Sequence, residues 1–270
     1  MRSPRAEALI ERREFKFLID ATTMSAVRDA IRPFCALDRH AASAKDQRYL
    51  IESLYLDTRD FALFHANEVE LKDRLKLRVR HYPGAGEQVF LEVKRRYHDV
   101  ILKTRGRVAA DAWPRLLADP FFPTHLLGSD PAVERFVALA HTHHAVPVSL
   151  VRYAREAWAS VVDDYARVTF DTRIEAQPAD RFAFAPDPCA WRALDDAENL
   201  GNHASLVVLE LKFTSQAPSW MMHLVQRLDL WRRAFSKYGS AVRATHGAPS
   251  RRTPTPALRS YLRPAPSEVP

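Results

Sequence analysis

The chain has 270 residues, 47% hydrophobic and 27% charged, so it can bury a sizeable core and is neither disordered nor fibrous in composition. Lysine and arginine outnumber aspartate and glutamate by 40 to 33, and the net charge of +7 favours an anionic partner such as a phosphate polymer, a nucleic acid or a membrane surface. The seven glycines form neither a Walker-type loop nor a GxGxxG loop, which excludes P-loop and dinucleotide-fold phosphate binding. Two cysteines, Cys35 and Cys189, cannot build a cysteine zinc site or a disulfide framework.

The two ends of the chain differ in composition from its centre. Residues 1–10 are expected to be an N-terminal extension, residues 11–244 one folded domain, and the proline-rich residues 245–270 a disordered tail. No stretch without charged residues is long enough to cross a bilayer as a helix, and residues 1–13 lack the apolar region of a signal peptide. We therefore expect a cytoplasmic protein.

Alternation of apolar and polar residues with period two dominates the folded part and predicts short strands. In chain order the strands are expected at Glu11–Ile19, Tyr49–Asp57, Arg74–Tyr82, Gln88–Arg96, Val100–Val108, Val148–Ala157, Ser160–Val162, Ala166–Ile174 and Leu206–Phe213. Helical spacing predicts helices at Thr22–Arg32, Arg59–Ala66, Asp130–Thr142 and Ser219–Phe235. In the last of these, an apolar face that ends at Trp231 is expected to pack into the core. The pattern is typical of a mainly β protein with an antiparallel sheet and peripheral helices.

The informative feature is the charged face of each strand. Within Arg74–Arg80, apolar residues point one way while Lys76, Arg78 and Arg80 point the other. Lys94 follows on the next strand, and Lys103, Arg105 and Arg107 share a face on the one after it. Solvated strand faces also alternate, but they normally mix signs, and like charges on neighbouring strands are destabilising. Two cations about 5 Å apart cost roughly 3 kcal/mol at an effective dielectric constant near 20. If the sheet closes into a barrel, such a face calls for a polyanion inside it.

Three glutamates interrupt this cationic pattern. Glu14, Glu92 and Glu210 each precede a lysine by two residues, so carboxylate and ammonium face the same space. Simple ion pairing explains the arrangement as well as a metal site does. A hard cation such as Mg²⁺ or Mn²⁺ is held by one or two carboxylates together with substrate phosphates. The spacing of these residues alone does not distinguish ion pairing from a metal site.

Seven short segments together resemble the VTC domain, the polyphosphate polymerase branch of the triphosphate tunnel metalloenzymes, which also include the CYTH enzymes. The resemblance covers Glu11 to Val242 and rests on EFKF at Glu14, SLYLDT at Ser53, LRVR at Leu77, FLEVK at Phe90, VRYAR at Val151, LELKF at Leu209 and FSKY at Phe235. It departs from the ExExK pattern of the wider superfamily, because Arg12 stands at the first position. That departure favours a VTC-like over a CYTH-like protein.

The resemblance implies an eight-stranded antiparallel tunnel barrel that holds ATP, triphosphate and polyphosphate, with Mn²⁺ or Mg²⁺ as cofactor. Lys237, Lys94 and Arg155 are then expected to be catalytic, and Glu210, with Glu92 and Glu14, to bind the metal. The expected phosphate-binding residues are Lys16, Arg78, Arg80, Lys94, Lys103, Arg105, Arg155, Arg167, Lys212 and Lys237. Arg105 or Arg107 could take the role of Lys103, because the three residues share one face.

The expected activity is transfer of the γ-phosphoryl group of ATP to a polyphosphate chain. Two alternatives stay open: hydrolysis of inorganic triphosphate or nucleoside triphosphates in the same tunnel, and a polyphosphate-binding module without catalysis. Direct nucleic-acid readout is not expected, because the cations alternate along strands and are not interleaved with stacking aromatic residues. Any export of product would require a separate membrane protein, through which the chain would become membrane-associated.

Overall fold

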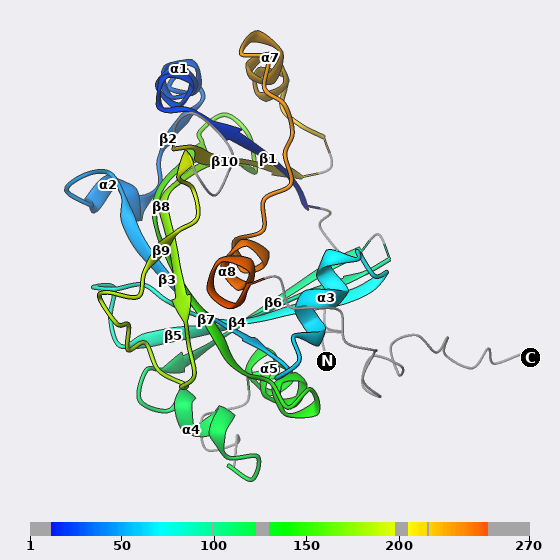
Figure 1. Ribbon diagram of the computed structural model, residues 1–270. Coiled ribbons are helices and arrows are strands. Elements are labelled where there is room, and N and C mark those ends of the chain that lie inside the picture. The colour runs from blue at the N-terminus through cyan, green and yellow to red at the C-terminus, as the bar shows by residue number, and fades with distance from the viewer. Residues whose placement is uncertain (1–11, 99, 123–129, 198–204, 215, 248–270) are drawn as a thin grey trace, which may run out of the picture. The chain divides into compact units, whose positions relative to one another are not determined.

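The computed structural model describes residues 12–98, 100–122, 130–197, 205–214 and 216–247 (Figure 1). The expected N-terminal extension and most of the expected tail lie outside these residues. Helix α8 (Lys237–His246) runs past the domain boundary that the composition indicates at residue 244. No helix in the described residues is both long and apolar enough to cross a membrane.

An antiparallel sheet forms the larger part of the regular secondary structure in the described residues. Hydrogen bonding orders eight strands as β1 (Arg12–Ile19), β10 (Val207–Thr214), β8 (Ala166–Pro178), β7 (Val146–Ser160), β3 (Tyr49–Asp57), β4 (Asp73–His81), β5 (Gln88–Tyr97) and β6 (Val100–Ala109). Two short strands lie off this path, β2 (Cys35–Leu37) on β7 and β9 (Arg192–Ala193) on β8. The mainly β class predicted from the alternation is confirmed. The strand expected at 148–157 is part of the longer β7, whereas the strand expected at 160–162 is wrong: β7 ends at Ser160, and Val161 and Val162 lie exposed in the following bend.

The expected barrel is not closed by strand pairing. In the part of the chain that the structure describes, the hydrogen-bonded path ends at β1 and at β6. The outer edge of β1 has another partner: Phe17 forms an isolated antiparallel bridge with Arg232, and the backbone N–H of Arg233 donates to the carbonyl of Lys16 at 2.9 Å. The segment at Arg232 and Arg233 thus satisfies backbone groups on the outer edge of β1, which a closing strand would satisfy in a barrel.

The chain divides into two compact units, each assembled from three stretches of sequence. Unit 1 consists of Met1–Tyr49, Ala154–Arg173 and Asp195–Phe235. Unit 2 consists of Leu50–Tyr153, Ile174–Leu194 and Ser236–Pro270. Strands β7 and β8 therefore contribute residues to both units. No composition shift marks these boundaries, and the sequence predicts a single domain here.

In unit 1 the helices α1 (Ala21–Ile31) and α7 (Ser219–Arg227) complete a core with β1 and β10, and α2 (Arg39–Ser43) follows β2. The side chain of Asp20 accepts from the backbone N–H of Thr23 and so caps α1. Phe17, Val27 and Leu209 are fully buried in this core. Phe15, Phe17 and Ile19 therefore face the core, and Glu14 and Lys16 occupy the opposite face of β1.

In unit 2 the apolar faces of β4 and β5 pack into a core with α4 (Trp113–Ala118) and α5 (Pro131–Thr142). Leu77, Leu91 and Phe136 are fully buried there. Helix α3 (Ala62–Glu68) follows β3 and contacts α8 (Figure 1). Lys76, Arg78, Arg80, Glu92 and Lys94 alternate with these buried residues, so they share the other face of the sheet.

The helix expected at Ser219–Phe235 is shorter than predicted, because α7 ends at Arg227. Asp229 has a φ of 45°, and the N–H of Leu230 donates to the carbonyl of Val225, which ends the helix. The core position expected for Trp231 is therefore wrong: its side chain lies in the following linker and is 74% exposed.

Candidate functional site

The strand register of unit 2 aligns the predicted cations in rows across three strands. Arg78 lies opposite Glu92, which lies opposite Arg105. The neighbouring row consists of three lysines in the order Lys76, Lys94 and Lys103. Directly opposed like charges destabilise a sheet unless an anion compensates them. The common face that the sequence predicts for these residues is confirmed.

Glu92 is 2% exposed, and cationic side chains surround it. Its carboxylate accepts a hydrogen bond from Arg78 Nε at 2.7 Å and lies 3.5 Å from Arg105 Nε. Arg80 Nε is 3.9 Å from the same carboxylate, and Lys103 Nζ is 4.0 Å away. We call these five residues the Glu92 cluster. One carboxylate thus faces four cations.

The cations of the cluster keep Glu92 ionised. Burial by itself would raise the pKa of Glu92, but Arg78, Arg80 and Lys103 hold that pKa far below its ordinary value. Glu92 is therefore an anion whose charge is over-compensated by its neighbours. Arg80 Nε is buried and has no hydrogen-bond partner within the described residues, and neither has Glu92 Oε1. Such a group of cations is suited to bind a further anion.

Two tyrosines connect this cluster to Lys237. The hydroxyl of Tyr153 accepts from Arg80 at 3.2 Å, and Lys237 Nζ lies 4.7 Å from the centroid of the Tyr153 ring. Tyr55 accepts from Arg78 at 3.3 Å. Burial would raise the pKa of Tyr55, but Arg78, Arg80 and Lys237 together hold it below its ordinary value. Lys237 therefore belongs electrostatically to the same group of cations.

The N-terminus of α8 is held from several sides. Ser236 caps the helix by accepting from the N–H of Gly239 at 3.1 Å, and its hydroxyl also accepts from Lys76 Nζ at 2.9 Å. One residue beyond Lys237, the hydroxyl of Tyr238 donates to the buried carboxylate of Asp57. Lys237 is 7% exposed as a result. A cation in this position is fixed by its helix rather than by a flexible loop.

Unit 1 contains a second group of charges around Glu210, which is 4% exposed. Its carboxylate lies 2.6 Å from Lys212 Nζ, 3.6 Å from Lys16 Nζ and 3.5 Å from Arg155. Thr169 donates to it at 3.5 Å. We call these five residues the Glu210 cluster. Arg155 is oriented by a bidentate pair with the fully buried Asp171, at 2.6 and 2.7 Å.

Glu210 and the nearby Glu14 are the predicted ligands of a hard divalent cation in unit 1. Glu14 and Glu210 approach the same ammonium group, because Lys16 Nζ lies 3.1 Å from the first and 3.6 Å from the second. The lysine thus marks a point where two carboxylates converge. No group of three or more histidine, cysteine or acidic residues is found among the described residues. Two carboxylates, with substrate phosphates supplying further oxygens, fit Mg²⁺ or Mn²⁺.

Glu92 offers a less suitable metal site than Glu210, which has three cationic neighbours and the carboxylate of Glu14 close by. Its four cationic neighbours would have to admit a further double positive charge next to them. The assignment of Glu92 as a metal ligand stays a prediction that these surroundings do not favour.

Most of the predicted phosphate-binding residues fall into these two groups, within their own units. Arg78, Arg80, Lys103 and Arg105 belong to the Glu92 cluster, and Lys237 adjoins it. Lys16, Lys212 and Arg155 belong to the Glu210 cluster. Lys94 and Arg167 lie at neighbouring register positions, opposite Lys103 and Lys212 respectively, and are more exposed. Their roles stay predictions.

Sequence reasoning assigned no site role to Tyr153, Tyr238, Ser236 or Asp171. Tyr153 lies between two predicted charge-bearing residues in the Val-Arg-Tyr-Ala-Arg string, and Tyr238 follows Lys237 directly. Their adjacency to predicted site residues is the only signal that could have identified them. Hydrogen bonds between residues far apart in the sequence cannot be predicted from the alternation of apolar and polar residues.

Comparisons with known proteins identify the family of the chain. A family model described as the VTC domain matches residues 11–246, nearly all of the described chain. That family is associated with polyphosphate metabolism, which indicates a polyphosphate-related function. A search of curated proteins finds no match.

Among solved structures, the PH1819 protein from Pyrococcus horikoshii OT3 is similar, with 13% sequence identity and a TM-score of 0.36. The alignment covers 81% of this chain and 86% of that one.

Proposed function

This chain belongs to the VTC domain family, and on that premise we propose that it is a polyphosphate polymerase that transfers the γ-phosphoryl group of ATP to a growing polyphosphate chain. The observation that supports the proposal most directly is the buried Arg80 Nε. It has no hydrogen-bond partner in the described chain, and most of the charged groups around it are cations, which cannot accept a hydrogen bond. Buried donors in folded proteins almost always have partners. A phosphate oxygen provides both the acceptor and the negative charge.

In this proposal the site residues of unit 2 have different roles. Arg78 and Arg80 bind non-bridging phosphate oxygens, for which the planar guanidinium group is well shaped. Lys237 stabilises negative charge on the phosphoryl group that is transferred. Tyr153 contacts both Arg80 and Lys237 and keeps them in fixed relation. Phosphoryl transfer needs positioning and charge neutralisation rather than a covalent nucleophile, and these residues provide both.

The metal ion would be held in unit 1 by Glu210 and Glu14. A bound Mn²⁺ or Mg²⁺ supplies neutralisation and alignment of phosphate oxygens. Lys16, Lys212 and Arg155 bind phosphate oxygens there, and Asp171 keeps the guanidinium group of Arg155 in place. Arg167 extends the cationic surface beside the Glu210 cluster, and Lys94 extends the one beside the Glu92 cluster.

Hydrolysis of a triphosphate uses the same cations but takes water as the acceptor. The row of lysines beside the Glu92 cluster favours the polymerase, because a polyanionic acceptor needs neutralisation in addition to that of the donor. A binding module without catalysis would need the cations but neither Lys237 nor the metal ligands.

The three functions are separated by one assay. Purified protein is incubated with ATP and Mn²⁺, and long chains are resolved on a gel while free phosphate is measured. The proposal predicts chains and ADP in proportion, whereas free phosphate without chains would establish the triphosphatase. Polyphosphate binding with no turnover would establish the binding module.

The same assay tests the assignment of residues. Arg80→Ala and Lys237→Ala are each expected to lower the rate by about 100-fold or more, since each removes a group that stabilises the transition state. Arg181→Ala and Lys45→Ala are matched controls, because both side chains are exposed. Equal rates in all four variants would contradict the assignment.

A further inference from the structure

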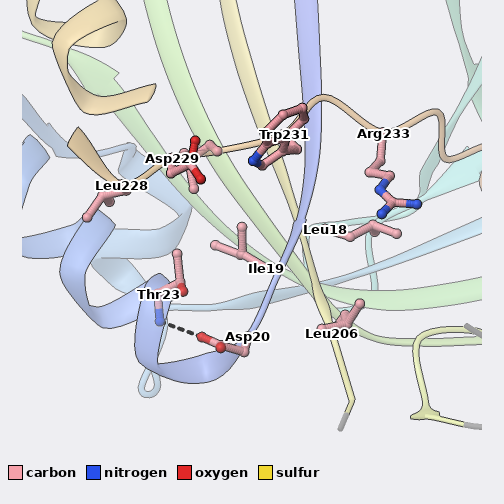
Figure 2. Close-up of a pocket in the computed structure, with 10 residues that line it drawn as sticks. Leu18, Ile19, Asp20, Thr23, Leu206, Leu228, Asp229, Trp231 and Arg233 are labelled. Carbon is pink, nitrogen blue, oxygen red and sulfur yellow. Dashed lines mark hydrogen bonds between the residues drawn. The ribbon is translucent and has the colours of Figure 1, made fainter. Parts of the chain in front are cut away.

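A pocket of about 460 Å³ opens beside the end of β1 in unit 1 (Figure 2). Aliphatic side chains that include Leu18 and Leu206 form its walls. Polar groups contribute to the lining as well: Asp20 and Asp229 lie on one side in Figure 2, and Arg233 lies on the other. Pockets of this size that combine apolar walls with polar groups are typical of sites for small organic ligands.

Trp231 is the most unusual residue of this pocket. It lies in the linker after α7, between Asp229 and Arg233 in Figure 2, and its side chain is 74% exposed. A solvent-exposed tryptophan ring lacks the stabilisation that burial of a large aromatic side chain provides. A planar ligand that stacks on the ring would recover it, and stacking of this kind is how proteins commonly hold nucleic-acid bases.

The pocket adjoins the Glu210 cluster through both the strand and the linker. Lys16 and Leu18 share one face of β1, because side chains alternate along a strand. The N–H of Arg233 donates to the carbonyl of Lys16 at 2.9 Å, and Lys16 Nζ donates to the carbonyl of Phe235 at 3.2 Å. A ligand in the pocket would therefore have its Arg233 side next to the predicted phosphate-binding and metal-binding residues.

We propose that this pocket binds the nucleoside part of the nucleotide substrate, with the base stacked on Trp231 and the phosphates leaving past Arg233 toward Lys16. The proposal rests on the proposed function, which requires a nucleoside triphosphate but assigns residues only to its phosphates. Asp20 and Asp229 accept hydrogen bonds from the amino group of a base or from ribose hydroxyls. A hydrogen bond from the backbone N–H of Thr23 lowers the pKa of Asp20, which keeps it a charged acceptor.

Binding measurements on the full chain test this assignment without relying on turnover. The dissociation constants of ATP and of inorganic tripolyphosphate, which has no nucleoside, are measured by calorimetry in Mn²⁺ for wild type and Trp231→Ala. We expect Trp231→Ala to weaken ATP by roughly 5- to 100-fold, because one stacked base is lost, and to leave tripolyphosphate unchanged. Trp231→Phe keeps an aromatic face and should retain most of the affinity for ATP. Phe121→Ala is the control, since this aromatic side chain is 92% exposed and belongs to unit 2.

The possible outcomes separate the pocket from the proposed function. If both ligands bind wild type and neither is affected by Trp231→Ala, the pocket assignment is wrong while the proposed function stands. An equal loss for ATP and tripolyphosphate would show that the linker acts on the phosphate site, which also overturns the assignment. If wild type binds neither ligand, the proposed function fails and this inference fails with it.

Discussion

Tyr238 donates a hydrogen bond from its hydroxyl to the carboxylate of Asp57, which is 0% exposed. Asp57 also accepts from the backbone N–H groups of Leu63 and Phe64 in the first turn of α3, each at 2.8 Å. The pair therefore joins the start of α3 to the start of α8. Because Lys237 immediately precedes Tyr238, the same contact fixes the position of a predicted catalytic cation.

Tyr238→Phe removes one donor from a buried carboxylate. Hydrogen bonds to charged groups contribute about 1.5–3 kcal/mol, so we expect a loss of stability in that range. Urea unfolding of the variant and of Tyr97→Phe, whose ring is 51% exposed, measures the effect against a matched control. Identical midpoints for the two variants would show that the contact contributes nothing.

The stability of the protein should also depend on pH through Asp57. Burial raises the pKa of Asp57 from its ordinary value of 3.8 to about 6. The folded state therefore binds the proton more tightly, so the contribution of this group is complete below about pH 4 and is lost as the pH rises through about 6. The two pKa values differ by an amount equivalent to about 3 kcal/mol.

Unfolding free energies of wild type and Asp57→Asn between pH 4 and pH 7 test this dependence. The advantage of wild type over the variant should shrink as the pH rises across this range. Asp180→Asn is the control, because this side chain is 90% exposed. A difference between wild type and Asp57→Asn that is constant across the range would contradict the raised pKa.

The fold and the charged face were predictable where period two governs the chain. Alternation in β4 places Arg78 and Arg80 on one face, and the observed register brings Glu92 and Arg105 onto it. The same rule brings Lys16 opposite Glu210 on neighbouring strands. Antiparallel pairing of strands with alternating charge is enough to produce both clusters, so this much follows from local pattern.

Features that depend on single backbone conformations or on distant contacts were not predictable. Helical spacing continues from Trp220 through Leu228 to Trp231, yet the left-handed conformation of Asp229 ends α7 early. Helix α8 was not predicted at all, because a hydrogen bond to Asp57, 181 residues away, helps to hold it. Which cations surround Glu92 depends on which strands are neighbours in the sheet. The alternation of residues within one strand does not predict the order of the strands.

Glu92→Gln keeps the shape of the buried side chain but removes the only charge that opposes four cations in its cluster. Breaking a buried ion pair by removing one partner typically costs about 3–5 kcal/mol, and exposure of Lys103 and Arg105 should reduce that figure. We expect the loss to be largest at low salt and to be reversed in part by tripolyphosphate, which replaces the missing charge. Glu175→Gln, which breaks a half-buried pair with Arg152, should cost at most about 1 kcal/mol. Thermal unfolding with and without tripolyphosphate measures both effects, and an absence of any ligand effect on Glu92→Gln would argue against an anion site.

Gly106 permits α5 to approach β6 closely. A Cβ at this position would lie 2.5 Å from Val133 Cγ2 and 2.7 Å from the backbone nitrogen of Val133. Gly106→Ala should therefore destabilise the protein by about 1–3 kcal/mol through overpacking. Adding Val133→Ala removes the side-chain conflict but not the backbone one, so denaturant unfolding of the double variant should show only partial recovery. Complete recovery would mean that the backbone can shift freely at this contact.

Glu210 and Glu14 provide the sharpest test of the predicted metal site, because both contact Lys16 and therefore face one point. Glu210→Gln and Glu14→Gln should each weaken Mn²⁺ binding by about 10-fold or more in the presence of tripolyphosphate, since each replaces a charged oxygen ligand by an amide. Titration followed by the electron paramagnetic resonance of free Mn²⁺ gives the affinity directly, with Glu175→Gln as a control that should bind as wild type does. Because the loss of either carboxylate leaves the neighbouring cations less neutralised, neither variant should lose affinity for tripolyphosphate in the absence of metal. If Mn²⁺ affinity is unchanged in both variants, the carboxylates serve only to position cations, and the metal ligands lie elsewhere in the chain.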